Sequence, residues 1–280
     1  MIKIIYILSL IRIFNILIGM LAVYIATIII NPDISIINIL MIMFQVGLVM
    51  ALGNLINDIQ DISTDKIAHP TRPLVTGKIN FKEAKIMMIL LFLLIGFISL
   101  SFSFKANLFL YIVILPLLFL YTNYLKPIPI IGNIIIAFLL SSIFIFTELC
   151  LLNSFSILQF PSILIFGLSF LRELLKDVQD YDGDATRGIY TLPVILGKKQ
   201  TINIAIILIM AYAIIILVPY FLKYFDYIYL YSIIILVEIP LFIMVFLLLN
   251  KPTNKSFKYI AYLTKGMSLA GLFIILILYI

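Results

Sequence analysis

Nine long runs of apolar residues, separated by short polar connections, occupy most of this 280-residue chain. A helix needs about 20 mostly apolar residues to cross the hydrocarbon core of a bilayer. Helices are expected because lipid offers the backbone no hydrogen-bonding partners, and because these runs are apolar on every face instead of alternating in polarity. The chain is therefore predicted to be an all-α polytopic membrane protein. The predicted spans are residues 9–30, 36–57, 83–104, 107–125, 130–152, 159–176, 200–222, 228–249 and 259–280.

The scarcity of charge supports this interpretation. Charged residues make up 11% of the chain and hydrophobic residues 64%, whereas globular domains have roughly 25% charged residues. The chain has too few charges to cover a water-facing surface, which excludes an ordinary soluble protein. The single cysteine, Cys150, excludes an internal disulfide and a cysteine-based metal site.

The basic residues indicate the orientation. With the N-terminus in the cytoplasm and the C-terminus outside, nine spans place every lysine and arginine except Lys105 and Lys223 at cytoplasmic ends and loops. The net charge of +6 thus reflects orientation in a cell membrane. It favours contact with anionic lipid headgroups or anionic substrates and not with nucleic acid. Because eight further spans follow, the first run is predicted to be a retained anchor and not a cleaved signal peptide.

An aspartate-rich stretch occurs twice in the chain. It reads NDIQDISTDKIAHPTRPLVTGKI from Asn57 and KDVQDYDGDATRGIYTLPVILGKK from Lys176. A proline and a Gly-Lys pair follow the aspartates in both copies. We interpret this as a parallel four-helix repeat within a single domain, with units of roughly 1–125 and 126–250 and a last helix at 259–280. The first aspartate motif is Asp58, Asp61 and Asp65, and at identical spacing the second is Asp177, Asp180 and Asp184.

The spacing of these aspartates places each motif on one face of a helix. Residues i, i+3 and i+7 share a stripe, which Asn54 extends in the first copy and Glu173 in the second. We expect two carboxylate ridges at one level, just inside the cytoplasmic boundary, which would repel each other unless a cation lay between them. Because Mg²⁺ commonly binds one or two carboxylates together with substrate phosphates, the ridges predict a magnesium site.

With these motifs, the sequence resembles the UbiA superfamily of membrane prenyltransferases. The resemblance implies a ring of nine helices around a central cavity that is capped by cytoplasmic loops and open sideways to lipid. It also implies Mg²⁺-dependent transfer of a polyprenyl group from its diphosphate to an acceptor. The matching pieces are NDIQDISTD, HPTRPLVTG, YTNYLKPIPIIGN, DVQDYDGD and TLPVILG, together with Arg12 and Asn15.

The resemblance assigns roles to the two motifs. Magnesium would neutralise the diphosphate and stabilise it as a leaving group. An apolar cavity rich in Tyr and Phe would shield the allylic carbocation, and ring faces would stabilise it. The catalytic metal ligands would be Asp58, Asp65, Asp177 and Asp184, with Asp61 and Asp180 as further ligands or partners of the ligands.

Basic residues are expected beside the metal. Arg72 matches the loop arginine of the family and should bind the diphosphate through two hydrogen bonds. Lys126, which follows Tyr121 at the mouth of the fourth helix, matches a family lysine with a similar role. The alternative for each basic residue is that it only follows the positive-inside rule. The remaining members of the predicted substrate-binding set are Asn15, Asn54, Lys176 and Arg187.

Four further polar residues fit the pattern less directly. Glu238 lies in mid-helix before Pro240, where an ionisable group is a functional candidate. It could instead be protonated and bonded to a backbone group that the proline leaves free. Glu148 is expected at the opposite interface, and His69 in a structural or surface role. Asn133 could pack between helices, or it could line the cavity.

The acceptor is inferred from the branch of the family that the sequence resembles most. That branch is archaeal, and it adds a geranylgeranyl group from geranylgeranyl diphosphate to the hydroxyl of geranylgeranylglyceryl phosphate, a lipid phosphate. One alternative is an aromatic-acid polyprenyltransferase of quinone biosynthesis, with an acceptor such as 4-hydroxybenzoate. The alternative that is not an enzyme is a cation-coupled transporter, but its carboxylates should lie near the bilayer midplane, and these lie at one rim.

Overall fold

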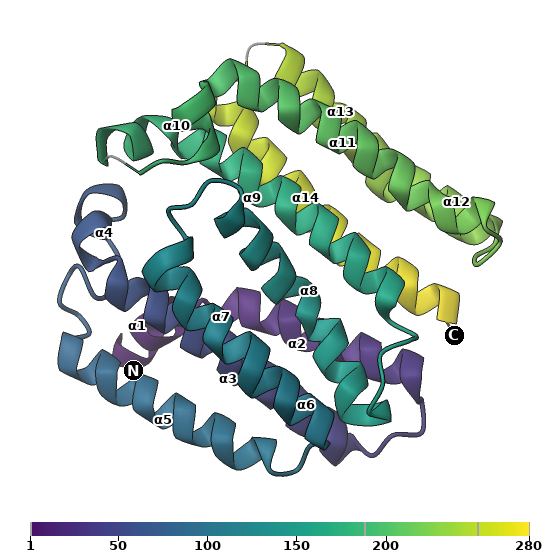
Figure 1. The fold of residues 1–280 in the computed structure, drawn as a ribbon, viewed down its shortest axis with the longest axis horizontal. Helices are drawn as coiled ribbons and strands as arrows, with labels where there is room; N and C mark the ends of the chain where they lie inside the picture. The colour runs from purple at the N-terminus through teal and green to yellow at the C-terminus, as the bar shows by residue number, and fades with distance from the viewer. Residues whose placement is uncertain (1, 188, 251, 280) are drawn as a thin grey trace. The chain divides into compact units, whose positions relative to one another are not determined.

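The computed structural model describes residues 2–187, 189–250 and 252–279, and all regular structure in these ranges is helical (Figure 1). The prediction of an all-α fold is therefore confirmed. The chain forms two compact units. Unit 1 contains Met1–Lys126 and Ser142–Gln159, and unit 2 contains Pro127–Ser141 and Phe160–Ile280.

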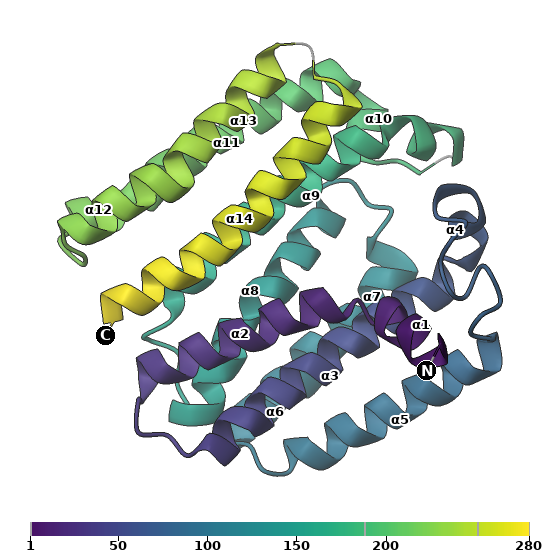
Figure 2. The same ribbon diagram turned by 180° about the vertical axis from the view of Figure 1, so that it is seen from behind.

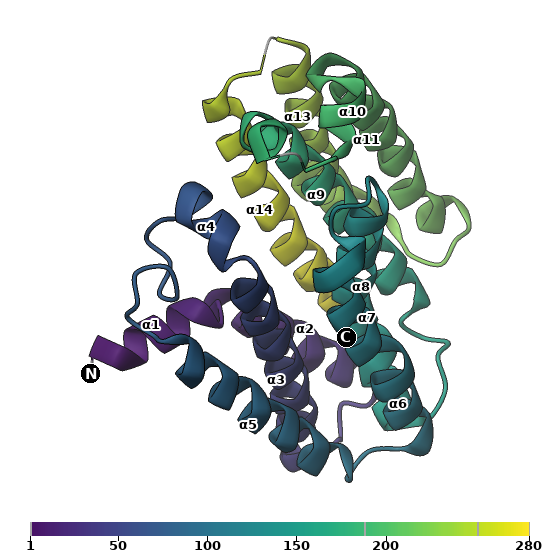
Figure 3. The ribbon, with the colours of Figure 1, turned by 60° about the vertical axis from the view of Figure 1, so that its left-hand side comes forward.

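Unit 1 is built around one long helix, α3, which packs against α2 on one side and α5 on another (Figures 2 and 3). A small core of Leu10, Leu55, Ile79 and Ala84 ties the N-terminal helix to the ends of α3 and α5. The helices of this unit are α1 (Ile2–Leu10), α2 (Ile13–Ile30), α3 (Ile36–Gln60), α4 (Ile62–Ala68), α5 (Phe81–Ser99), α6 (Phe104–Phe109), η1 (Leu110–Ile114), α7 (Leu115–Leu120), η2 (Tyr121–Leu125) and the second half of α8 (Ile131–Leu152).

The first predicted span, 9–30, differs from the observed structure. It is divided into α1 and α2 because Arg12 adopts left-handed backbone angles, with φ 56°. The predicted span 107–125 is continuous, but it contains two π-helical segments, η1 and η2. Hydrophobic periodicity does not detect either feature, because both are local changes of backbone geometry inside an apolar run.

Unit 2 packs α9, α11, the continuous helix formed by α12, η3 and α13, and α14 around one apolar core. Figure 1 shows α11 beside α13, and the hydrogen bond from Tyr212 to the Leu164 carbonyl joins α11 to α9. The helices of this unit are the first half of α8, α9 (Gln159–Arg187), α10 (Leu192–Leu196), α11 (Lys198–Phe221), α12 (Tyr227–Ile233), η3 (Ile234–Glu238), α13 (Ile239–Leu249) and α14 (Asn254–Tyr279).

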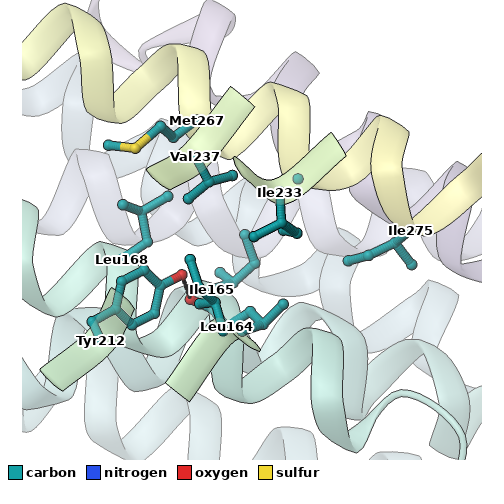
Figure 4. A pocket seen from close by; sticks show the side chains of 10 residues that line it. Leu164, Ile165, Leu168, Tyr212, Ile233, Val237, Met267 and Ile275 are labelled. Carbon is teal, nitrogen blue, oxygen red and sulfur yellow. Dashed lines mark hydrogen bonds between the residues drawn. The ribbon is translucent and has the colours of Figure 1, made fainter. Parts of the chain in front are cut away.

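A narrow pocket lies inside the core of unit 2 (Figure 4). Leu168, Val237 and Met267 contribute to its apolar wall, and the Tyr212 hydroxyl donates to the Leu164 carbonyl over 2.9 Å. The pocket has a volume of about 20 Å³, which is room for about one water molecule. It is therefore too small to hold a prenyl chain.

Seven helices in the described part of the chain are long and apolar enough to cross a membrane. The two other predicted spans, 83–104 and 159–176, correspond to α5 and α9, which carry several charged residues near one end. The seven long apolar helices indicate that the chain is a membrane protein. The seven are Ile13–Ile30, Ile36–Gln60, Phe104–Leu125, Ile131–Leu152, Lys198–Phe221, Tyr227–Leu249 and Asn254–Leu278.

Candidate active site

The first aspartate motif lies where α3 ends and α4 begins. Asp58 is in the last turn of α3, Asp61 joins the two helices, and Asp65 is in α4. The Asp61 N–H donates to the Asn57 carbonyl over 2.9 Å, and the Asp65 N–H donates to the Asp61 carbonyl over 2.7 Å. These bonds continue the helical path almost unbroken from α3 into α4. The three carboxylates therefore follow one another along a helix, as their spacing in the sequence predicts. Asp58 is 4% exposed and Asp65 is 5% exposed.

Arg72 lies between two of these carboxylates. Its Nη1 atom is 3.3 Å from Asp58 Oδ1 and also forms an ion pair with Asp65 Oδ2. The loop after α4 brings it there, since the Arg72 N–H donates to the carbonyl of His69 over 3.0 Å. Buried carboxylates are costly without a partner. One guanidinium therefore compensates two of them, and Arg72 lies beside the first aspartate motif as predicted.

Arg12 is a second cation at this motif, although it was predicted only as a residue that matches the family. Its Nη2 donates to Asp58 Oδ1 over 2.7 Å, and its Nη1 donates to Asn54 Oδ1 over 2.9 Å. Asn54 in turn donates from Nδ2 to the Ile11 carbonyl over 2.8 Å, at the break between α1 and α2. The backbone of Arg12 is left-handed, and from this position its side chain reaches α3. Its charge inside the first apolar run is the signal that could have identified it.

Lys126 pairs with the third carboxylate of the motif. Its Nζ forms an ion pair with Asp61 and donates to Asn57 Oδ1 over 3.3 Å. Asn57 also donates from Nδ2 to Asp61 Oδ2 over 2.9 Å. The Lys126 N–H bonds to the Tyr121 carbonyl, five residues earlier, over 2.8 Å. This π-helical turn sets the position of Lys126. Each aspartate of the first motif therefore has a cationic partner.

The second aspartate motif lies within one continuous helix, because α9 extends well past the predicted span 159–176 to Arg187. Asn133 of α8 donates from Nδ2 to Asp177 Oδ2 over 2.8 Å. Burial raises the pKa of Asp177 to about 6, and the hydrogen bond from Asn133 partly opposes this shift. Asp184 is buried, with 8% exposure. Asp180 is exposed.

Three other residues of the predicted substrate-binding set lie outside the contacts described above. Lys176 is exposed and lies 3.4 Å from Glu173, whose carboxylate also accepts from Arg172 Nη2 over 2.9 Å. Arg187 is the last residue of α9, and its side chain lies outside the described part of the structure. In unit 1, Asn15 is exposed, and no described hydrogen bond joins its side chain to the first motif.

The donor set of the motifs fits a hard divalent cation. In the described ranges, no group of three or more His, Cys, Asp or Glu side chains is close enough to hold a metal ion by itself. Mg²⁺ needs only one or two carboxylates when water and substrate phosphates complete its octahedral shell. Asp58 and Asp65, which share Arg72, form such a pair. The site therefore suits magnesium that arrives with a phosphate-bearing substrate.

Two glutamates lie apart from the aspartate motifs. Glu148 is fully buried and accepts hydrogen bonds from the backbone N–H groups of Ser156, Ile157 and Leu158 over 2.6–2.8 Å. It therefore fixes the loop between α8 and α9. Glu238 is 6% exposed, and its Oε1 atom has no hydrogen-bond partner among the described residues. The alternative, a bond to a backbone group that Pro240 leaves free, is thus not seen at this oxygen.

Comparison with known proteins identifies the family. A sequence model of the UbiA prenyltransferase family matches residues 13–276. This chain belongs to the UbiA prenyltransferase family. The prediction of a membrane prenyltransferase is thereby confirmed, in place of the transporter alternative.

Several UbiA relatives carry one name. The chain is 37% identical to the digeranylgeranylglyceryl phosphate synthase of Methanocaldococcus jannaschii, with 81% of this chain and 78% of that protein covered. It is 33% identical to the synthase of the same name from Saccharolobus solfataricus, with 72% of each covered.

Solved UbiA structures share the fold. One, from a study of digeranylgeranylglyceryl phosphate synthase in membranes, has a TM-score of 0.77 and 32% identity, covering 100% of this chain and 99% of that one. A UbiA homologue from Archaeoglobus fulgidus, bound to GPP and Mg²⁺, has a TM-score of 0.69 and 19% identity, covering 96% and 99%. The similarity to the Archaeoglobus fulgidus structure shows a shared fold and nothing more.

Proposed function

We propose that this UbiA protein transfers a geranylgeranyl group from geranylgeranyl diphosphate to the hydroxyl of geranylgeranylglyceryl phosphate, giving digeranylgeranylglyceryl phosphate for membrane lipid synthesis. The observation that carries the proposal is the first aspartate motif, in which Asp58 and Asp65 share Arg72. This arrangement combines ligands for Mg²⁺ with a group that recognises a diphosphate. The names of the relatives supply the choice of donor and acceptor.

The aspartates of both motifs would hold the metal. We assign Asp58, Asp65, Asp177 and Asp184 as catalytic ligands. Magnesium, when bound, would neutralise the diphosphate and make it a better leaving group. Asp61 and Asp180 would act as further ligands or as hydrogen-bonding partners of the ligands.

The cations beside the first motif would bind the diphosphate. Arg72 has the planar donor geometry that pairs with phosphate oxygens through two hydrogen bonds. Arg12 and Lys126 hold their charges against Asp58 and Asp61, and both can contribute to binding the same anion. In this proposal Asn54 keeps Arg12 in place through the hydrogen bond that it accepts. Tyr121, Asn15, Lys176 and Arg187 complete the proposed substrate-binding set.

At C1 of the donor one bond breaks and one bond forms, and one proton is transferred. The allylic C1–O bond of the donor breaks heterolytically, and its electron pair leaves with the diphosphate. The glycerol hydroxyl oxygen of the acceptor then forms a bond to C1, and its proton passes to the departing diphosphate or to a motif carboxylate. The apolar residues of the spans would exclude water from the allylic cation.

The proposal includes a topology of nine spans in a ring around a central cavity, as one domain with a four-helix repeat, a cytoplasmic N-terminus and an outer C-terminus. The repeat has local support in each unit. Gly77 and Gly197, which align in the two copies, both have positive φ, 70° and 87°. The first residues of α8 also supply Asn133 to Asp177, much as Arg12 at the start of α2 reaches Asp58.

The test is an acceptor assay with the purified protein. Labelled geranylgeranyl diphosphate and Mg²⁺ are supplied with geranylgeranylglyceryl phosphate, 4-hydroxybenzoate or no acceptor, and the lipid products are separated. We expect product with the glyceryl phosphate acceptor alone. Product with 4-hydroxybenzoate alone would overturn the proposed acceptor and favour the aromatic-acid enzyme. No product with any acceptor would overturn the proposed activity.

A further inference from the structure

A groove in unit 1 lies away from the candidate active site. It has a volume of about 340 Å³, within the range of small-ligand sites. The end of α3, the start of α5 and the segment from α7 into η2 form its walls. Ile56 and Gln60 of α3 both line it, and each is two residues from Asp58. Two residues correspond to a rotation of about 200° around a helix, so the groove faces away from the aspartates.

The groove has one apolar part and one polar part. Ile56, Met88 and Phe119 supply the apolar wall. Gln60 is the last residue of α3 and Asn123 lies within η2, and the Gln60 Nε2 donates to Asn123 Oδ1 over 2.8 Å. This division matches a molecule with a hydrocarbon chain and a polar head, lying at the depth where membrane helices reach the headgroups.

Lys85 supplies a positive charge at the polar part. It is exposed and lines the groove, and its Nζ lies 4.6 Å from the centre of the Phe81 ring. No ion pair with a carboxylate is found for Lys85 in the described ranges, and Glu83 on the same helix is paired with Lys3 over 2.7 Å. The ammonium group therefore keeps its capacity to bind an anion.

We propose that this groove binds the headgroup of an anionic phospholipid from the surrounding bilayer. The lipid phosphate would accept hydrogen bonds from Lys85 and from the free amide hydrogens of Gln60 and Asn123. The upper part of one lipid chain would lie along Met88 and Phe119. Free phosphate does not fit as well, because the apolar wall contributes to binding only when the anion carries a chain.

The test compares two lysines on one helix. Lys85→Gln removes the charge in the groove, and Lys82→Gln removes a charge one turn earlier on α5 that is outside the groove. Delipidated protein is titrated with phosphatidylglycerol or phosphatidylcholine of equal chain length, and bound lipid is counted by native mass spectrometry. We expect tighter binding of phosphatidylglycerol by the unaltered protein. Lys85→Gln should weaken this binding about tenfold, as expected for one charge-assisted hydrogen bond.

The controls decide between this assignment and simpler explanations. Lys82→Gln should change the affinity less than about twofold, and Lys85→Arg should retain binding because it keeps both charge and donors. Equal losses for Lys82→Gln and Lys85→Gln, or no preference for phosphatidylglycerol, would overturn the proposal. Competition by millimolar glycerol phosphate would also overturn it, because the site would then bind the free anion. Lys85→Gln should leave prenyl transfer intact. A negative result for lipid binding can therefore be distinguished from a negative result for the proposed prenyl transfer.

Discussion

Arg12 offers a sharp test of how the first motif is held together. Its side chain donates two hydrogen bonds, to Asp58 and to Asn54. A hydrogen bond that involves a charged group contributes about 1.5–3 kcal/mol, and solvent screening reduces this for Arg12, whose side chain is 33% exposed. We therefore expect Arg12→Ala to lower the free energy of unfolding by about 2–4 kcal/mol.

The left-handed backbone at Arg12 provides an internal control. A residue with a Cβ atom is disfavoured in this region by roughly 1–2 kcal/mol, and glycine is not. Arg12→Gly loses the same hydrogen bonds as Arg12→Ala but relieves the backbone strain, and the greater freedom of glycine in the unfolded chain offsets part of that gain. We expect the glycine variant to be more stable than the alanine variant by up to about 1 kcal/mol.

The assay is a denaturant titration of each purified variant in detergent micelles, with Arg12→Lys as a variant that keeps the charge. Arg12→Lys should fall between the unaltered protein and Arg12→Ala, because one ammonium cannot reproduce the paired donors of a guanidinium. A loss below about 0.5 kcal/mol for Arg12→Ala would place the hydrogen bonds at the level of a weak surface contact. That result would contradict the assigned hydrogen bonds, and a glycine variant less stable than the alanine variant would contradict the backbone strain at Arg12.

Three other predictions follow from the contacts. Asp58→Asn and Asp177→Asn should each nearly abolish turnover with the helical content kept, measured by product formation and circular dichroism; activity in both would exclude the proposed metal site. Arg72→Ala should raise the KM for the diphosphate donor about 10- to 100-fold, and an effect confined to the acceptor would reassign this residue. Glu148→Gln should lower the unfolding free energy by about 1–3 kcal/mol, because an amide nitrogen would face the buried Leu158 N–H; unchanged stability in a thermal melt would contradict this.

Seven of the nine predicted spans correspond to described helices that are long and apolar enough to cross a membrane, because a run of apolar residues has few alternatives to a membrane helix. The prediction 130–152 corresponds to Ile131–Leu152, and 228–249 corresponds to Tyr227–Leu249. The membrane span predicted at 159–176 ended where the apolar character ended, whereas α9 continues to Arg187, in agreement with the aspartate spacing that placed the second motif on a helix. A helix does not have to stop at that boundary, since a polar stretch in water can continue it.

The residues of the candidate site could be proposed from the sequence, but their contacts could not. Repetition and spacing identified the aspartates, and the resemblance identified Arg72 and Lys126 as residues to lie beside them. The ion pair between Arg12 and Asp58 joins residues 46 positions apart, and Arg12 has a left-handed backbone conformation. No periodic pattern encodes such a conformation. Similarly, the π-helical turn that positions Lys126 has no signature in the apolar pattern.

The single nitrogen of Arg72 that serves both Asp58 and Asp65 has a consequence for the order of substrate loading. If magnesium binds these two carboxylates as proposed, metal and guanidinium compete for the same oxygens, and a displaced Arg72 needs a new anion. A diphosphate that accepts Arg72 would therefore tighten the binding of metal. By reciprocity, the metal would tighten the binding of diphosphate to the same degree. The two would then enter together as one complex more readily than either would enter alone.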